Sequence, residues 1–135
     1  MEITENRMVV MSERELFDGD WKEVVKYRCY MKGSGIVCRY FRLEIADGWY
    51  LTLRKTECIG LSLTTLKFGE VHTICMLSAY QRISPLRSVA NRGLRNSADG
   101  GCFGDAFKHR LYDAIERRFP MSESEIADER KKGGC

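Results

Sequence analysis

Cys102 is the residue whose type and setting come closest to enzyme chemistry. It follows Gly100-Gly101 and precedes a predicted helix that begins at Asp105, and a helix N-terminus stabilises a thiolate. His72 or His109 would supply the base of a Cys/His nucleophilic site. No known signature surrounds Cys102, and a small buried thiol beside a glycine turn explains the same residues. A Cys102-based enzyme therefore ranks third among the functions that the sequence leaves open.

His72, Cys75, Cys102 and His109 are also of the types that bind zinc. Their spacing differs from the tight ligand pairs of structural zinc sites. The chain also has no Gly-rich phosphate loop of the P-loop or dinucleotide-binding form. We therefore expect no metal, no cofactor and no catalytic residue.

Basic residues and tyrosines alternate through residues 24–56, and the pairing predicted below puts them on one face of a sheet. They are Lys26, Arg28, Tyr30, Tyr40, Arg42, Tyr50 and Arg54. Cations neutralise phosphates and tyrosines stack on bases, and a sheet can enter a DNA groove. An ordinary solvated strand face and a protein interface favour the same residue types, so all three interpretations stay open.

A second basic segment lies between residues 81 and 119, with eight Lys or Arg against four Asp or Glu. Ser84-Pro85 suits the start of a helix over residues 85–95, which would carry Arg87, Arg92 and Arg95. The start of that helix would receive a phosphate, and a solvated helix face is the alternative. Residues 1–20 instead carry six acids against two bases, so the charge is uneven although the net charge is only +3. Such asymmetry is typical of a surface for a polyanion or an acidic partner.

The basic and tyrosine residues depend on a predicted meander of three antiparallel strands over residues 24–56. Ala46-Asp47-Gly48 suits a hairpin loop with Gly48 in the left-handed conformation. The predicted pairs across it are Ile45 with Trp49, Leu43 with Leu51 and Phe41 with Leu53. A loop at Gly33-Ser34-Gly35 would pair Met31 with Val37, Tyr27 with Phe41 and Val25 with Leu43. Arg39 is the exception on the apolar face, and we expect it near the sheet end or extended to water.

The other predicted elements flank this meander. Residues 7–12 suit a strand, and Ser12 with Glu15 forms a capping signal for one helical turn. Residues 57–77 fit a strand or a helix, with a β-branched run from Val71 that favours a strand. Apolar residues recur every four positions from Asp105 to Phe119 and predict a helix that packs on the sheet. Residues 120–135 have little to bury, and we expect them to form a mobile tail.

The 135 residues predict one compact α+β domain over 1–135, in which a sheet of four to six antiparallel strands is covered by helices at about 85–95 and 105–119. The acidic N-terminus and the lack of a long apolar run predict no secretory signal, no membrane partner, free thiols and a cytoplasmic location. We expect a non-enzymatic binding protein for nucleic acid or a nucleoprotein. The alternative is a protein-binding inhibitor or adaptor, such as a phage-type anti-defence protein that blocks a nucleic-acid-processing machine. Oligomeric state stays open.

Overall fold

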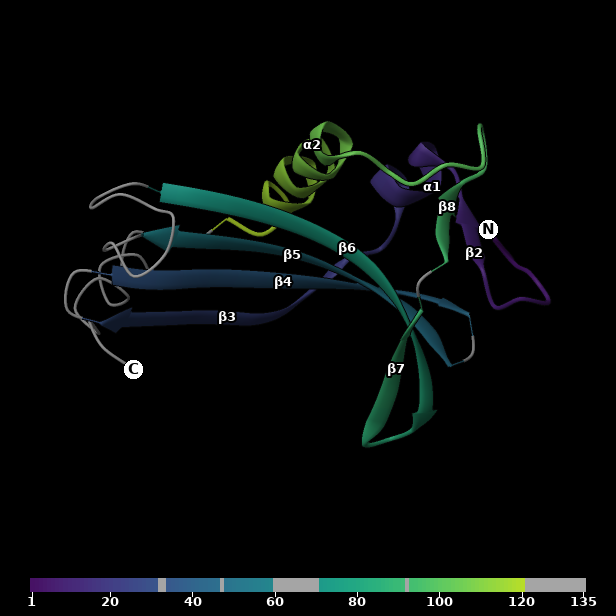
Figure 1. Ribbon diagram of the computed structural model, residues 1–135, viewed down its shortest axis with the longest axis horizontal. Coiled ribbons are helices and arrows are strands. Elements are labelled where there is room, and N and C mark those ends of the chain that lie inside the picture. The colour runs from purple at the N-terminus through teal and green to yellow at the C-terminus, as the bar shows by residue number, and fades with distance from the viewer. Residues whose placement is uncertain (32–33, 47, 60–70, 92, 121–135) are drawn as a thin grey trace.

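Five antiparallel strands form the main sheet, in the order β3-β4-β5-β6-β7 (Figure 1). Their bounds are β3 Lys22–Met31, β4 Ser34–Ala46, β5 Trp49–Ile59, β6 Val71–Ser84 and β7 Arg87–Asn91. The computed structural model describes residues 1–31, 34–46, 48–59, 71–91 and 93–120. Of these, 25–31, 34–37, 58–59, 71–72 and 91 are described by their backbone alone. The predicted tail from 121 onward lies outside the described residues.

A smaller sheet joins two N-terminal strands to a strand late in the chain. β1 (Glu2–Ile3) pairs antiparallel with β2 (Val9–Met11), and β2 pairs parallel with β8 (Leu94–Asn96). The short helix α1 (Glu13–Asp18) follows β2 directly. Ser12 accepts a hydrogen bond from the Glu15 backbone N–H and Glu15 accepts one from Ser12, so the predicted capping box is confirmed.

The predicted three-stranded meander is confirmed, and so is most of the register between β4 and β5. Leu43 lies opposite Leu51 and Phe41 opposite Leu53. Gly48 has a φ of +78°, the left-handed conformation for which glycine is suited. The predicted pair of Ile45 with Trp49 is wrong, because Trp49 lies opposite Ala46 and the ladder shifts between Glu44 and Ala46. This irregularity adds one residue to β4 next to the turn.

The predicted register between β3 and β4 is wrong. Met31 lies opposite Ser34 instead of Val37, and Tyr27 lies opposite Cys38 instead of Phe41. The shift is three residues, and the ladder contains an irregularity at Val24. Successive residues of a strand belong to opposite faces of the sheet. A shift by an odd number of residues therefore puts each of these β3 positions on the face opposite to the predicted one, relative to β4.

The helix predicted over residues 85–95 is also wrong, because this segment forms β7 and β8. Pro85 and Leu86 make the turn between β6 and β7, and Ser84 lies opposite Arg87. Proline has the same fixed φ at the first position of a helix and at the first central position of a turn, so Ser84-Pro85 suits both. The strand alternative for Val71–Leu77 is confirmed, since β6 begins at Val71.

The helix α2 (Asp105–Glu116) lies over one face of the main sheet, as predicted (Figure 1). Gly104 is its N-cap and Arg117 its C-cap, so it ends before the predicted Phe119. The helix buries Phe107, Leu111, Tyr112 and Ile115 in one continuous core with both sheets and α1. We call the face under α2 the inner face and the opposite one the outer face. Burial of this apolar stripe is the main stabilisation of the sheet.

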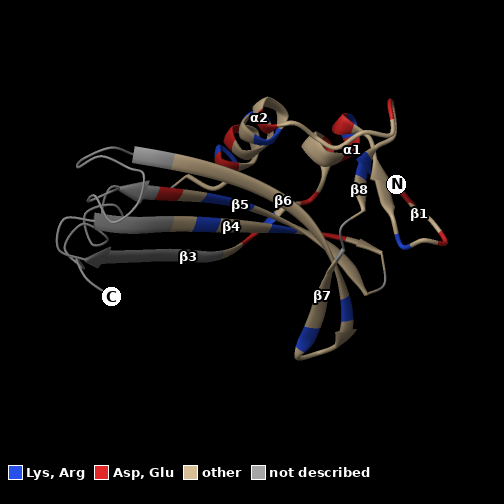
Figure 2. Cartoon of the chain, in the orientation of Figure 1, with Lys and Arg blue, Asp and Glu red and all other residues tan. Residues whose placement is uncertain are grey.

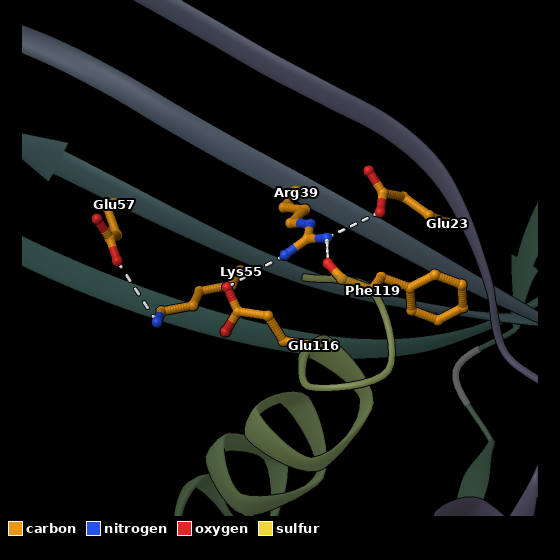
Figure 3. A network of polar contacts seen from close by, with 6 residues as sticks. All are labelled: Glu23, Arg39, Lys55, Glu57, Glu116 and Phe119. Atoms are coloured by element: carbon orange, nitrogen blue, oxygen red, sulfur yellow. Dashed lines mark hydrogen bonds and ion pairs between the residues drawn. The ribbon is translucent and has the colours of Figure 1, made fainter. Parts of the chain in front are cut away.

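Arg39 lies on the inner face but does not reach water, contrary to the expectation for it. It is only 6% exposed. Its guanidinium contacts the Glu23 carboxylate at 2.8 Å and the Glu116 carboxylate at 3.3 Å, and it donates a hydrogen bond to the Phe119 carbonyl (Figure 3). Two carboxylates and one carbonyl therefore supply the negative charge that a buried cation requires.

Two buried ionisable groups, Cys75 and Tyr112, make the free energy of unfolding fall as the pH becomes alkaline. Burial raises the pKa of the Cys75 thiol from 9.0 to about 11, and burial also raises the pKa of Tyr112. The unfolded Cys75 ionises before the folded one, so its contribution is present below pH 9 and is lost as the pH rises to about 11. We expect the free energy of unfolding, measured with urea, to fall by on the order of 2 kcal/mol from Cys75 over this range.

The matched control for this pH dependence is Cys75→Ala, which removes the thiol. This variant should lose less stability than the wild type between about pH 9 and pH 11, whatever its stability at neutral pH. Equal slopes for the two proteins would show that Cys75 does not carry the alkaline transition.

Candidate functional site

The outer face of the main sheet brings basic, aromatic and hydroxyl side chains of three strands together. Tyr40 lies opposite Arg54, and Thr52 lies between Arg42 on one side and Ser78 on the other. These side chains surround a hollow of about 210 Å³, which we call the outer groove. Its lining residues are Val24, Tyr40, Arg42, Thr52, Arg54, Met76, Ser78 and Tyr80. These residues include two arginines and no carboxylate, so the groove suits an anion.

Aromatic rings hold the arginines of this face in place. The Arg42 guanidinium lies 4.4 Å from the ring centre of Tyr50, and that of Arg82 lies 5.4 Å from the same ring. Arg54 lies 5.8 Å from the ring centre of Tyr40. Tyr50 and Tyr80 stack with 5.4 Å between their ring centres. Arginine on an aromatic ring keeps its planar N–H groups available to a ligand.

Tyr50 has a supporting position and not a contact position. It is 7% exposed, and its hydroxyl donates a hydrogen bond to Ser88 of β7 at 2.8 Å. Tyr40 and Tyr80 are half-buried and line the groove. Of the three tyrosines that these strands contribute, Tyr40 and Tyr80 therefore have the exposed area that a stacking contact requires.

The cations near the groove are only partly neutralised within the protein. Arg82 contacts Glu44 at 3.5 Å, and both side chains are exposed, so solvent screens this ion pair. The Arg42 Nε is buried and has no hydrogen-bond partner among the described residues. An Nε that the protein covers cannot reach a ligand, so any contact of Arg42 with an anion would come from its terminal N–H groups.

The structure does not bring all the predicted site residues together. Tyr40, Arg42, Tyr50 and Arg54 lie on the outer face. The backbone register pairs Lys26 with Arg39, Arg28 with Val37 and Tyr30 with Gly35, instead of with Arg42, Tyr40 and Cys38 as predicted. The side chains of Lys26, Arg28 and Tyr30 lie outside the described part.

The second basic segment is divided between two sheets. Arg87 is exposed on β7, and Arg95 lies on β8, where it contacts Cys102. Arg92 lies outside the described residues. No helix joins the three arginines, so the predicted phosphate site at a helix start near Ser84 does not exist.

Sequence reasoning missed Ser78 and Tyr80 and assigned Arg82 to the second basic segment, whereas β6 contributes all three to the outer face. The signal was present, because these residues alternate as the side chains of one strand face do. The predicted strand stopped at Leu77, whereas β6 continues to Ser84. A strand extended through this alternation would have identified the third wall of the groove.

The described neighbour of the Cys102 thiol is an arginine. Cys102 is exposed, and an Arg95 Nη atom lies 2.6 Å from its sulfur. Arginine is a cation without a basic lone pair, so it cannot accept the thiol proton. His72 is described by its backbone alone. In the part of the chain that the structure describes, no three His, Cys, Asp or Glu side chains lie close enough to hold a metal ion.

Comparisons with protein-family models, with curated proteins and with solved structures find no match to this chain. Within the described ranges, neither α1 nor α2 has the length and apolar content needed to cross a membrane.

Proposed function

We propose that this protein is a non-enzymatic cytoplasmic protein that binds nucleic acid, alone or in a nucleoprotein complex, through the outer groove. The observation that carries the proposal is the arrangement of Arg42, Arg54 and Arg82 around Tyr40 and Tyr80. Cationic N–H groups would contact phosphates while the tyrosine rings stack on bases. Each member of this set comes from a strand of one rigid sheet, which favours a preformed binding surface.

Single-stranded nucleic acid fits this surface better than a duplex does. A base can stack on a tyrosine only when it is released from its own base pair. The groove is a hollow in a sheet, whereas reading a duplex requires a helix or ribbon that enters one of its grooves. Such stacking tolerates any base, so we expect weak sequence preference.

Titration of a fluorescent single-stranded oligonucleotide, followed by fluorescence anisotropy, tests the proposed function. With three phosphate contacts, affinity should fall roughly 20-fold between about 50 mM and about 200 mM salt. A duplex of the same sequence should bind more weakly, because its bases are not available to stack.

Two outcomes would count against the proposed function. No anisotropy change at low salt would exclude direct binding of the oligonucleotide. Binding of an acidic peptide in its place, lost when Arg42 and Arg54 are changed, would instead assign the groove to a protein partner. The protein would then be the inhibitor or adaptor of the alternative hypothesis.

A further inference from the structure

The hairpin of β6 and β7 extends away from the helices and the small sheet (Figure 1). Every residue from 82 to 90 is exposed. Three of these residues are large and apolar: Ile83 is 52% exposed, Leu86 100% and Val89 49%. Among the large apolar side chains of the described residues, these three have the largest exposed fractions.

β7 is the last strand of the main sheet, so in the described part of the chain it has a hydrogen-bonded neighbour only on the β6 side. Exposed edge strands normally carry charges or proline that prevent pairing with another strand. Residues 87–91 have one charge, at Arg87, and no proline. β3, at the opposite edge, has four charged residues in its sequence, so the weakly protected edge is β7.

We propose that β7 pairs with β7 of a second copy of this chain, antiparallel about a two-fold axis at Val89. This register places Val89 opposite Val89 of the second copy, Arg87 opposite Asn91 and Ser88 opposite Ala90. The main sheet then continues from one copy into the other. The unpaired edge and the half-exposed Val89 are both covered by the pairing.

Charge permits this register in a pair of identical strands. The two Arg87 residues stand four positions apart along the strands, which is about 14 Å. That separation exceeds the Debye length of about 8 Å at physiological salt, so their repulsion is largely screened. In Figure 2 the hairpin carries the blue of Lys and Arg and none of the red of Asp and Glu. A parallel pairing of the two β7 strands would instead place the two Arg87 residues side by side.

The pairing has a consequence that rests on the proposed function. A two-fold axis perpendicular to the sheet leaves the outer faces of both copies on the same side. The two outer grooves then lie on one continuous surface, and Tyr50 ties β7 to its own groove through the hydrogen bond to Ser88. One strand of nucleic acid that reaches both grooves would bind more tightly than either groove alone binds it.

Analytical ultracentrifugation of the full chain tests the pairing without any nucleic acid. We expect the mass to rise from 15.6 kDa to twice that value with concentration. Val89→Asp places two carboxylates opposite each other and should raise the dissociation constant of the dimer at least about tenfold. The matched control is Ile74→Asp, a 41% exposed position on β6 that does not line the outer groove, which should leave the dimer unchanged. A monomer at every concentration, or a dimer that survives Val89→Asp, would overturn the proposal.

A disulfide measures the register directly. Val89→Cys should give a covalent dimer under mild oxidation, because directly opposite Cα atoms lie about 5 Å apart. Arg87→Cys should not exceed the wild-type background, to which the native cysteines contribute, because its counterpart lies about 14 Å away along the strand. Equal cross-linking of the two variants would exclude the register.

A monomer that captures a different protein through Val89 would assign the edge to that protein and also overturn the proposal. Loss of oligonucleotide binding alone would leave the dimer in place and refute only the proposed function.

Discussion

Replacing Arg42 and Arg54 together by glutamate should weaken oligonucleotide binding at least about 100-fold at about 0.1 M salt. Each change removes a phosphate contact and adds a repulsive charge, and a tenfold loss for each corresponds to about 1.4 kcal/mol. Both residues line the outer groove on neighbouring strands. The measurement is the anisotropy titration with the single-stranded oligonucleotide, together with circular dichroism of the free variant to verify that the sheet is retained.

The matched control changes the same number of charges elsewhere. Arg14→Glu plus Arg110→Glu alters exposed residues on α1 and α2, away from the outer face. This control should weaken binding by no more than about threefold, since only long-range attraction changes. Equal losses in the two double variants would show that net charge, and not the groove, causes binding.

A lysine variant separates charge from stacking geometry. Arg42→Lys plus Arg54→Lys retains both positive charges but loses the planar guanidinium that packs on Tyr50 and Tyr40. Its affinity should lie between those of the wild type and the glutamate variant. Full wild-type affinity would mean that the rings do not position the cations.

The second large effect is expected at the buried cation. Arg39→Ala should lower the free energy of unfolding by about 3 kcal/mol, measured with urea at neutral pH. The substitution removes the contacts to Glu23, Glu116 and the Phe119 carbonyl, and it leaves a cavity beside Phe41, whose ring centre lies 5.0 Å from the guanidinium. Glu23 and Glu116 are 23% and 40% exposed, so water compensates part of their loss.

Two further variants apportion this effect. Arg39→Met keeps most of the volume and removes the charge, so it should lose less stability than Arg39→Ala. Glu116→Gln removes one exposed charge and should cost under about 1 kcal/mol. If Arg39→Met is as stable as the wild type, the ion pairs contribute nothing and the packing of the side chain carries the whole effect.

The local sequence pattern predicted those elements in which apolar residues repeat with one clear period. Matching apolar residues on both sides of Gly48 predicted the register of β4 and β5. The four-residue repeat of apolar side chains predicted α2 and the face that it covers. The outer-face positions of Tyr40, Arg42 and Arg54 followed from the same alternation. In each case burial of one face leaves a single favourable arrangement.

Ambiguous local signals were resolved only by tertiary pairing. Ser84-Pro85 suits a helix start or a turn, and the ladder between β6 and β7 selects the turn. Pairing of Met31 with Ser34, instead of with Val37, reverses the alternation of β3 relative to β4, and no period in the sequence displays that pairing. The partners of Arg39 lie 16 and 77 residues away in the chain, so its burial as a cation depends on how α2 docks.

By itself, therefore, the sequence determined the strands β4 and β5, the helix α2 and a basic, tyrosine-bearing face on those strands. Only the tertiary structure decided that Ser78 and Tyr80 complete the outer groove, that Lys26 and Arg28 follow a different register, and that β7 forms an edge. The physical reason is that periodicity reports which face of an element is buried. Which elements meet, and in what register, depends on the burial and charge pairing of residues far apart in the chain.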